Sequence, residues 1–128
     1  MKRALIDWDF ASHGIWIVNL PPGEVSGQSK VGHGREEGAP ADRVQNTRPW
    51  SELLTTSLLD RLQIWNDRGC SLSRRPADNQ RDERDWDSFF REGRALAETT
   101  QMELGEHWQV LWAAYGAWHF VRLPELTP

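Results

Sequence analysis

Residues 107–123 read HWQVLWAAYGAWHFVRL, and this stretch decides the fold. Its β-branched and aromatic residues favour extended structure, while Tyr115-Gly116 is suited to a two-residue hairpin turn. We therefore predict strands over His107–Ala113 and Ala117–Leu123 that pair as an antiparallel hairpin. Both strands carry large apolar side chains at consecutive positions, so the hairpin should have two apolar faces.

The predicted register assigns these side chains to faces. Ala114 faces Ala117, and the pairs Ala113–Trp118 and Trp112–His119 follow. One face then carries Leu111, Ala113, Trp118 and Phe120, and the other carries Trp108, Val110, Trp112, Val121 and Leu123. A slipped register would change the partners but leave both faces apolar.

A first hairpin is predicted near the start of the chain. Residues 3–10 alternate, with Ala4, Ile6, Trp8 and Phe10 on one side and Leu5, Asp7 and Asp9 on the other. Ser12-His13-Gly14 supplies a turn, and residues 15–20 form a second strand that Pro21 and Pro22 end. In that strand Ile15 and Ile17 share one side, opposite Trp16, Val18 and Leu20.

Two helices are predicted between the hairpins. Ser57 and Asp60 resemble a capping box ahead of Leu58, Leu62 and Trp65, and Gly69 is a natural C-terminal residue, which gives a helix over about 57–68. Trp50, Leu53 and Leu54 form an apolar lead-in that can add a turn. The second helix carries an apolar stripe from Trp86 to Leu104, ends at Gly105 and allows an Arg94–Glu98 pair. Gly93 in that stripe leaves room for a bulky neighbour such as Trp65.

These elements predict one α+β domain over 1–128. The order ββ-αα-ββ is simplest as a four-stranded, mainly antiparallel sheet with both helices on one face. Residues 21–49 are rich in Gly and Pro and poor in large apolar side chains, which predicts a flexible insertion. Residues 70–84 are polar and predict a solvated connector.

Because two helices can cover only one face of such a sheet, the other face needs a different cover. The candidates are residues 21–49, a second copy of the chain, or a partner protein. The 21–49 segment is polar, and an open patch this aromatic exceeds what monomers usually tolerate. We therefore expect an interface, with a second copy or with another protein, rather than cover by the chain itself.

The charge, the hydropathy pattern and the cysteine count argue against several classes of function. The formal net charge of −4 argues against general nucleic-acid binding, which requires a basic surface. No apolar run is long enough to cross a bilayer, and Asp7 and Asp9 interrupt the segment that could resemble a signal peptide. The single cysteine, Cys70, precludes an internal disulfide, so we expect a cytoplasmic protein without a membrane association.

Few residues point to chemistry. Asp7 and Asp9, at i and i+2 of a predicted strand, could hold Mg²⁺, which prefers carboxylate oxygens. The four histidines lack metal-ligand spacing, and no nucleophile motif is present. We therefore expect no catalytic, cofactor-binding or metal-binding residues, and we expect Cys70 to be a bystander.

Three segments carry a resemblance to known proteins. Residues 62–67 (LQIWND), 92–97 (EGRALA) and 103–105 (ELG) resemble motifs of a group of small, largely uncharacterised bacterial proteins. The similarity covers the opening strand and residues 51–123, whereas 21–49 looks like an insertion. In style, as small acidic α+β proteins, such chains also resemble immunity proteins of bacterial toxin systems. The resemblance implies no catalytic residues.

We therefore expect a non-catalytic protein-binding protein, with an immunity protein that neutralises a bacterial toxin as the leading hypothesis. Acidic side chains beside exposed aromatic residues suit a basic partner. The residues expected on that surface are Asp7, Asp9, Trp16, Asp60 and Asp67. The alternatives are a small metal-dependent enzyme that uses Asp7 and Asp9, and a regulatory homodimer.

Overall fold

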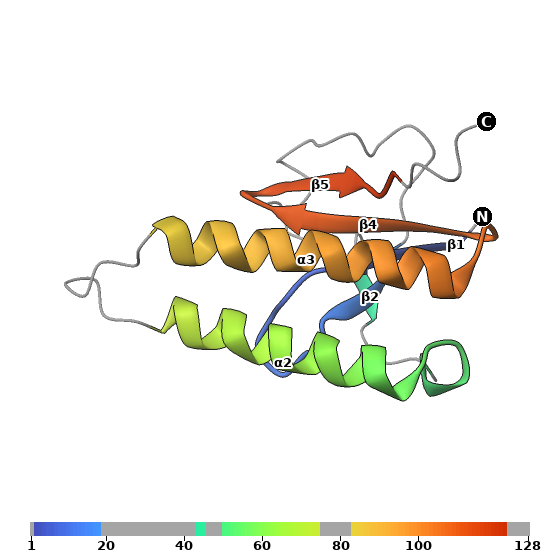
Figure 1. Cartoon of the computed structure of the whole chain (residues 1–128), viewed down its shortest axis with the longest axis horizontal. Coiled ribbons are helices and arrows are strands. Elements are labelled where there is room, and N and C mark those ends of the chain that lie inside the picture. Colours follow the sequence, from blue (N-terminus) through green and yellow to red (C-terminus); the bar gives the residue numbers. More distant parts are fainter. Residues whose placement is uncertain (1, 19–42, 46–49, 75–82, 123–128) are drawn as a thin grey trace.

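The computed structural model describes residues 2–18, 43–45, 50–74 and 83–122, and it has the predicted α+β fold (Figure 1). The chain forms strands β1 (Lys2–Ile6), β2 (Ile15–Val18) and β3 (Arg43–Gln45), then a short 3-10 helix, η3 (Trp50–Glu52). Helices α2 (Thr56–Ser73) and α3 (Glu83–Leu104) follow, and strands β4 (Trp108–Ala114) and β5 (Ala117–Phe120) complete the fold. The predicted order ββ-αα-ββ is confirmed, and β3 is an additional strand.

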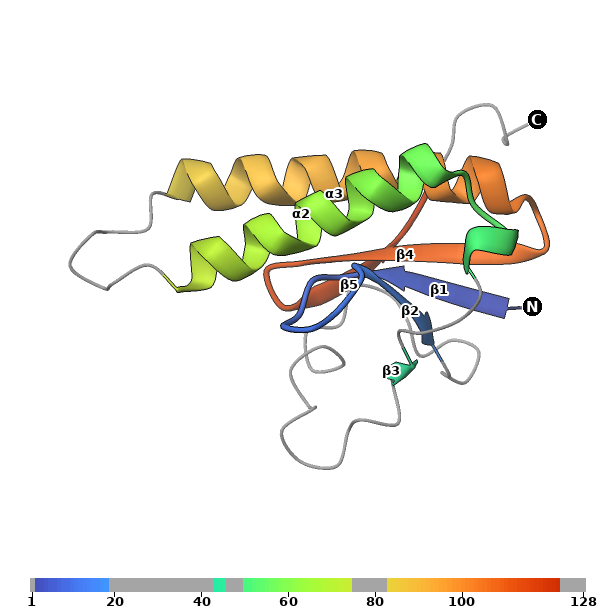
Figure 2. The same ribbon diagram turned by 90° about the horizontal axis from the view of Figure 1, so that it is seen from below.

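The strands form one sheet in the order β3-β2-β1-β4-β5. Three of its pairings are antiparallel, and the central pairing of β1 with β4 is parallel. The two helices connect the first strands to β4 as a crossover, which is the type of connection that parallel neighbours require. Both helices lie on the same face of the sheet, as Figure 2 shows.

The stretch 21–49, expected to be a flexible insertion, contains the three residues of β3, which pairs with β2 at the sheet edge. The expectation of no regular structure was therefore wrong for residues 43–45. The other residues from 21 to 49 lie outside the described part of the chain. The predicted connector at 70–84 is also shorter than expected, because α2 continues to Ser73 and α3 begins at Glu83.

Both predicted hairpins form, and the second has the predicted residue partners. In the second, Ala114 pairs with Ala117, Ala113 with Trp118 and Trp112 with His119. Tyr115 and Gly116 both have positive φ angles, 52° and 78°, which is the type I′ geometry expected of a two-residue turn. The first strand is shorter than predicted, because regular pairing stops at Ile6 and residues 7–14 form a loop.

Helix α2 begins and ends outside the predicted bounds. Its N-cap is Thr55, whose Oγ1 accepts a hydrogen bond from Leu58 N at 3.2 Å. Glu103 of α3 accepts from both Thr55 N and Thr55 Oγ1, at 2.8 and 2.9 Å, and so completes the cap from another helix. Gly69 does not end the helix. A Cβ there would lie 2.6 Å from Phe89 Cζ and 2.7 Å from Trp8 Cγ, so this glycine allows two aromatic rings to approach.

Helix α3 matches its prediction closely. Gly105 ends it with a φ of +87°, and Arg94 Nε lies 3.3 Å from Glu98 Oε2. A Cβ at Gly93 would lie 2.6 Å from Trp65 Cζ2, so the expected close approach of Trp65 is confirmed. Trp65 stacks on Phe89 with ring centroids 4.5 Å apart and nearly parallel planes. These contacts fix α2 against α3.

The apolar side chains divide between two clusters, one on each face of the sheet. The helix-side core joins α2 and α3 to Ala4, Ile6 and Ile15 of the sheet. The far-face cluster consists of Leu5, Val18, Leu111 and Trp118, with Trp16, Ala113 and Phe120 packed against it. The face assignments predicted for the second hairpin, and for the first hairpin within Lys2–Ile6 and Ile15–Val18, are therefore confirmed. The predicted alternation does not extend to residues 7–10, because β1 ends at Ile6.

Candidate functional site

The far face of the sheet is not the open aromatic patch that the sequence analysis expected. Leu5, Val18, Leu111 and Trp118 are between 0% and 6% exposed in the single chain. Trp16, Ala113 and Phe120 beside them are half-buried. The inference that this face requires a second copy or a partner was therefore wrong, because the chain buries these side chains without one.

Two of the five expected partner-binding residues lie close to that face. Trp16 packs on the far-face cluster, and its Nε1 donates a hydrogen bond to Asp7 O at 3.1 Å. Asp7 N donates to Gly14 O at 3.1 Å, which closes the loop of residues 7–14. Trp16 and Asp7 are thus joined by a hydrogen bond within the chain. The Trp16 side chain lies on the face of the sheet that α2 and α3 do not cover.

The other three expected residues lie on or beside α2. Asp60 and Asp67 are exposed, and Ile64 lies between them at the spacing i, i+4, i+7 that places residues on one face of a helix. Ile64 is 68% exposed. We call these three residues the α2 stripe. Asp9 lies in the loop of residues 7–14, which packs beside the same helix.

Polar side chains of α2 hold that loop in place. Asn66 Oδ1 accepts from Asp9 N, and Asn66 Nδ2 donates to Asp9 O, both at 3.0 Å. Gln63 Nε2 donates to Ser12 O and to Asp67 Oδ1, both at 3.1 Å. The loop therefore has a defined position next to the α2 stripe, and its Phe10 side chain is 48% exposed.

Asp7 and Asp9 do not have the strand geometry that the metal-site hypothesis assumed. The pairing of β1 ends at Ile6, so the alternation that would place both carboxylates on one strand face does not extend to them. Asp9 Oδ1 accepts from Phe10 N at 2.8 Å, a local turn contact. No group of three or more His, Cys, Asp or Glu side chains that could hold a metal occurs among the described residues.

Cys70 lies at the junction of α2 with the loop. Its Sγ is 3.6 Å from Asp9 O and 3.9 Å from Asn66 Nδ2. Burial raises the pKa of the Cys70 thiol above its ordinary value, and Asp67 and Asp9 raise the pKa further while Arg74 lowers it. A raised thiol pKa reduces the thiolate fraction at neutral pH, so this cysteine is a weak nucleophile.

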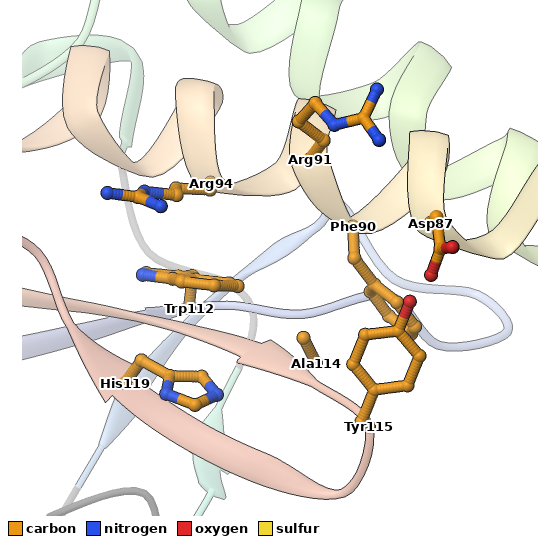
Figure 3. Close-up of a pocket in the computed structure, with 8 residues that line it drawn as sticks. All are labelled: Asp87, Phe90, Arg91, Arg94, Trp112, Ala114, Tyr115 and His119. Carbon is orange, nitrogen blue, oxygen red and sulfur yellow. The ribbon is translucent and has the colours of Figure 1, made fainter. Parts of the chain in front are cut away.

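A pocket lies between α3 and the β4–β5 hairpin, with a volume of about 370 Å³. Figure 3 shows the Phe90 ring of the helix beside Tyr115 of the hairpin, and Arg94 of the helix over Trp112. The sequence analysis did not single out this pocket. Its signal was present in the helical spacing of Asp87, Phe90, Arg91 and Arg94, but which strand these residues face is decided only by the packing of α3 on the sheet.

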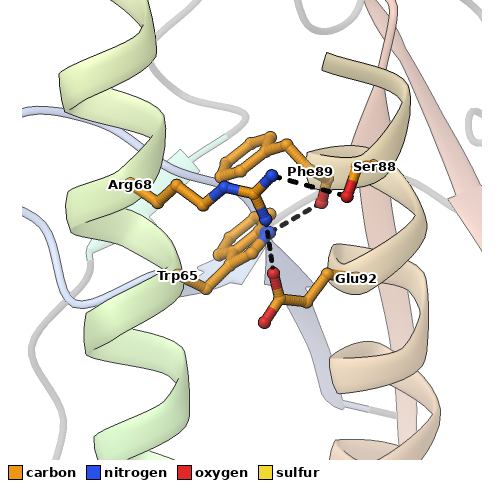
Figure 4. A network of polar contacts seen from close by, with 5 residues as sticks. All are labelled: Trp65, Arg68, Ser88, Phe89 and Glu92. Atoms are coloured by element: carbon orange, nitrogen blue, oxygen red, sulfur yellow. Dashed lines mark hydrogen bonds and ion pairs between the residues drawn. The ribbon is translucent and has the colours of Figure 1, made fainter. Parts of the chain in front are cut away.

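A polar network between the helices serves the fold. Arg68 Nη1 lies 2.8 Å from Glu92 Oε1, and Arg68 Nη2 lies 3.4 Å from Ser88 Oγ (Figure 4). Beneath it, Trp65 Nε1 donates to Phe89 O at 2.9 Å, which satisfies the buried indole. The network connects α2 to α3, and none of its contacts involves a residue of the α2 stripe.

Two further findings concern identity and location. No helix in the described part of the chain is long and apolar enough to cross a membrane. Comparison of the chain with protein-family models, curated proteins and solved structures finds no match. The resemblance carried by residues 62–67, 92–97 and 103–105 therefore stays a prediction.

Proposed function

We propose that this chain is a non-catalytic cytoplasmic protein whose α2 surface binds a basic protein partner, in the manner of an immunity protein that neutralises a bacterial toxin. The observation that carries the proposal is the α2 stripe, in which an exposed isoleucine lies between two exposed aspartates. An apolar anchor flanked by acidic groups complements a basic surface that has an apolar pocket.

The arrangement of the neighbouring loop supports the same proposal. Asn66 and Gln63 fix the loop of residues 7–14 by hydrogen bonds to Asp9 and Ser12. The exposed Phe10 is thus presented beside α2 without a need to order the loop on binding. A preformed surface loses less conformational entropy when it associates, and so retains more of its contact energy as affinity.

The charges define the partner's chemistry. Asp60 and Asp67 are solvent-exposed, and the chain as a whole has a net charge of −4. Such a surface accelerates association with a positively charged protein, such as a nuclease domain, and the effect weakens as salt screens it. We therefore predict that the partner is a basic protein, encoded by a gene adjacent to the gene for this chain.

The test is calorimetry with the purified product of the adjacent gene. Burying a side chain of this size contributes about 1.5–3 kcal/mol, so Ile64→Ser should raise the Kd by roughly 10–100-fold. Asp60→Asn/Asp67→Asn should raise the Kd and make it depend less on salt concentration.

Matched controls come from surfaces elsewhere. Met102→Ser removes an apolar side chain that is 64% exposed on α3, and Glu106→Gln neutralises an exposed acid before β4. Neither should change the affinity. The absence of a basic neighbour, or a complex that tolerates all the α2 variants, would refute the proposal.

A further inference from the structure

We propose that the pocket between α3 and the β4–β5 hairpin binds a small planar aromatic compound that carries an anionic group, either a phosphate or a carboxylate. This site lies apart from the α2 stripe. Helix α3 supplies Asp87, Phe90, Arg91 and Arg94, and the hairpin supplies Trp112, Ala114, Tyr115 and His119. The volume of about 370 Å³ falls within the range of small-ligand sites.

Aromatic rings stand on two sides of the pocket, with the small side chain of Ala114 between them (Figure 3). On one side, Trp112 stacks on His119 with centroids 4.5 Å apart, and the Arg94 guanidinium lies over Trp112 at 5.8 Å. On the other side, the rings of Phe90 and Tyr115 are 4.7 Å apart. A flat ring fits between such walls, and each aromatic contact of this kind is favourable.

The charges of the lining favour an anion. Two arginines and one aspartate line the pocket, whereas the whole chain has a net charge of −4. Arg94 pairs with Glu98 at 3.3 Å, whereas Arg91 has no ion pair among the described residues. A guanidinium presents a planar pair of donors that matches a carboxylate or a phosphate, so Arg91 is the expected contact for the anionic group. Asp87 can accept a hydrogen bond from a ring N–H or amino group.

The backbone of Tyr115 gives independent support. Its φ is +52°, a region that bulky residues rarely adopt and that Asn or Gly would occupy with less strain. The ring is 65% exposed, so it contributes little to the core. A tyrosine is thus kept at a turn position where folding favours another residue, and its ring forms one side of the pocket. The type I′ turn itself requires the positive φ, so the observation that bears on the pocket is the choice of a tyrosine there in place of Asn or Gly.

The experiment is isothermal titration of the full chain with adenosine 5′-monophosphate and with indole-3-acetate, which present a phosphate and a carboxylate on a planar ring. Ligands of this size reach a Kd of roughly 100 µM or tighter in a matching pocket. Binding of the nucleotide alone assigns a phosphate ligand, and binding of the indole compound alone assigns a carboxylate ligand. Adenosine and inorganic phosphate, each lacking one half of the proposed chemistry, should bind at least about tenfold more weakly.

Three variants locate the binding. Arg91→Ala removes the cation expected to contact the anionic group, and Tyr115→Asn removes a wall of the pocket while relieving the turn. Each should weaken binding by about tenfold or more, and Tyr115→Asn should do so with an unchanged or higher Tm. Arg61→Ala, at an exposed arginine of α2, is the control and should bind as the parent chain does.

Several outcomes would overturn the proposal. The first is that neither compound binds at concentrations up to about 1 mM. The second is that inorganic phosphate binds as tightly as adenosine 5′-monophosphate. The third is that both Arg91→Ala and Tyr115→Asn bind as tightly as the parent chain. Because Arg91 and Tyr115 are both exposed, these variants should fold, and a thermal melt of each checks that they do.

Discussion

The two faces of the sheet are both apolar, yet they are buried in different ways. The helix-side core is covered by α2 and α3, and its rings are stacked and hydrogen-bonded, as for Trp65 and Phe89. Neither α2 nor α3 lies over the far-face cluster, but Trp118 is as fully buried as Trp65, at 1% exposed. The comparison shows that an apolar strand face in the sequence predicts that its side chains are buried. It does not predict which part of the structure covers them.

The largest expected effect separates these two tryptophans. Trp65→Ala should lower the free energy of unfolding by about 3–5 kcal/mol, since it opens a cavity and removes the hydrogen bond from the indole to Phe89 O. Trp118→Ala should cost roughly 1 kcal/mol less, because its half-buried neighbours can relax into the space. Denaturant unfolding of both variants measures the difference. An equal or larger cost for Trp118→Ala would show that the far face contributes as much as the helix side.

The next effect concerns how tightly the helices pack on their own side. In an ordinary helix position Gly→Ala stabilises by about 1 kcal/mol, but at Gly93 the new Cβ would meet the Trp65 ring. Gly93→Ala should therefore destabilise the protein by about 1–3 kcal/mol. The smaller ring in Trp65→Phe should reduce this cost.

The reverse exchange at an exposed site of the same helix provides the control for Gly93. Ala95→Gly should cost about 1 kcal/mol, which reports helix propensity alone. Thermal or denaturant unfolding serves for all these variants. If Gly93→Ala stabilised the chain, the contact between Gly93 and Trp65 would not constrain the packing.

A smaller effect is expected where α3 caps α2. Glu103→Ala removes both contacts to Thr55 and should cost about 1 kcal/mol, as should Thr55→Ala. Because the two residues act together, the double variant should cost clearly less than the two single costs combined. Glu106→Ala, at a nearby exposed acid, should stay within about 0.5 kcal/mol of the parent. Additive costs in the double variant would exclude a shared cap.

The smallest effect concerns Cys70 on the helix side. Because burial raises the pKa of its thiol, the folded chain holds less thiolate than the unfolded chain at any pH below the folded pKa. Iodoacetamide should therefore alkylate Cys70 more slowly in the folded protein, and Arg74→Ala, which removes a charge that lowers the pKa, should slow it further. Alkylation as fast as in denaturant would contradict this prediction.

Much of the fold followed from local patterns, and the candidate sites followed less well. Period-two alternation assigned Leu111 and Trp118 to one face and Val110 and Trp112 to the other, and the Tyr115-Gly116 turn gave the register. Asp60 and Asp67 were predicted as partner-binding residues, and the structure adds Ile64 between them. The pocket escaped prediction, because its residues come from α3 and from the β4–β5 hairpin, which are separate in the sequence and meet only in the folded chain.

The amino-acid sequence by itself determined the two long helices, the four strands of the two hairpins, the faces of those strands and the close approach at Gly93, since these depend on periodicity and on the volume of single residues. Only the tertiary structure decided the parallel pairing of β1 with β4, the capping of Thr55 by Glu103 and the passage of α2 through Gly69. Each of these depends on contacts between residues that are distant in the chain. Local propensity depends only on neighbours in the sequence, so it cannot predict such contacts.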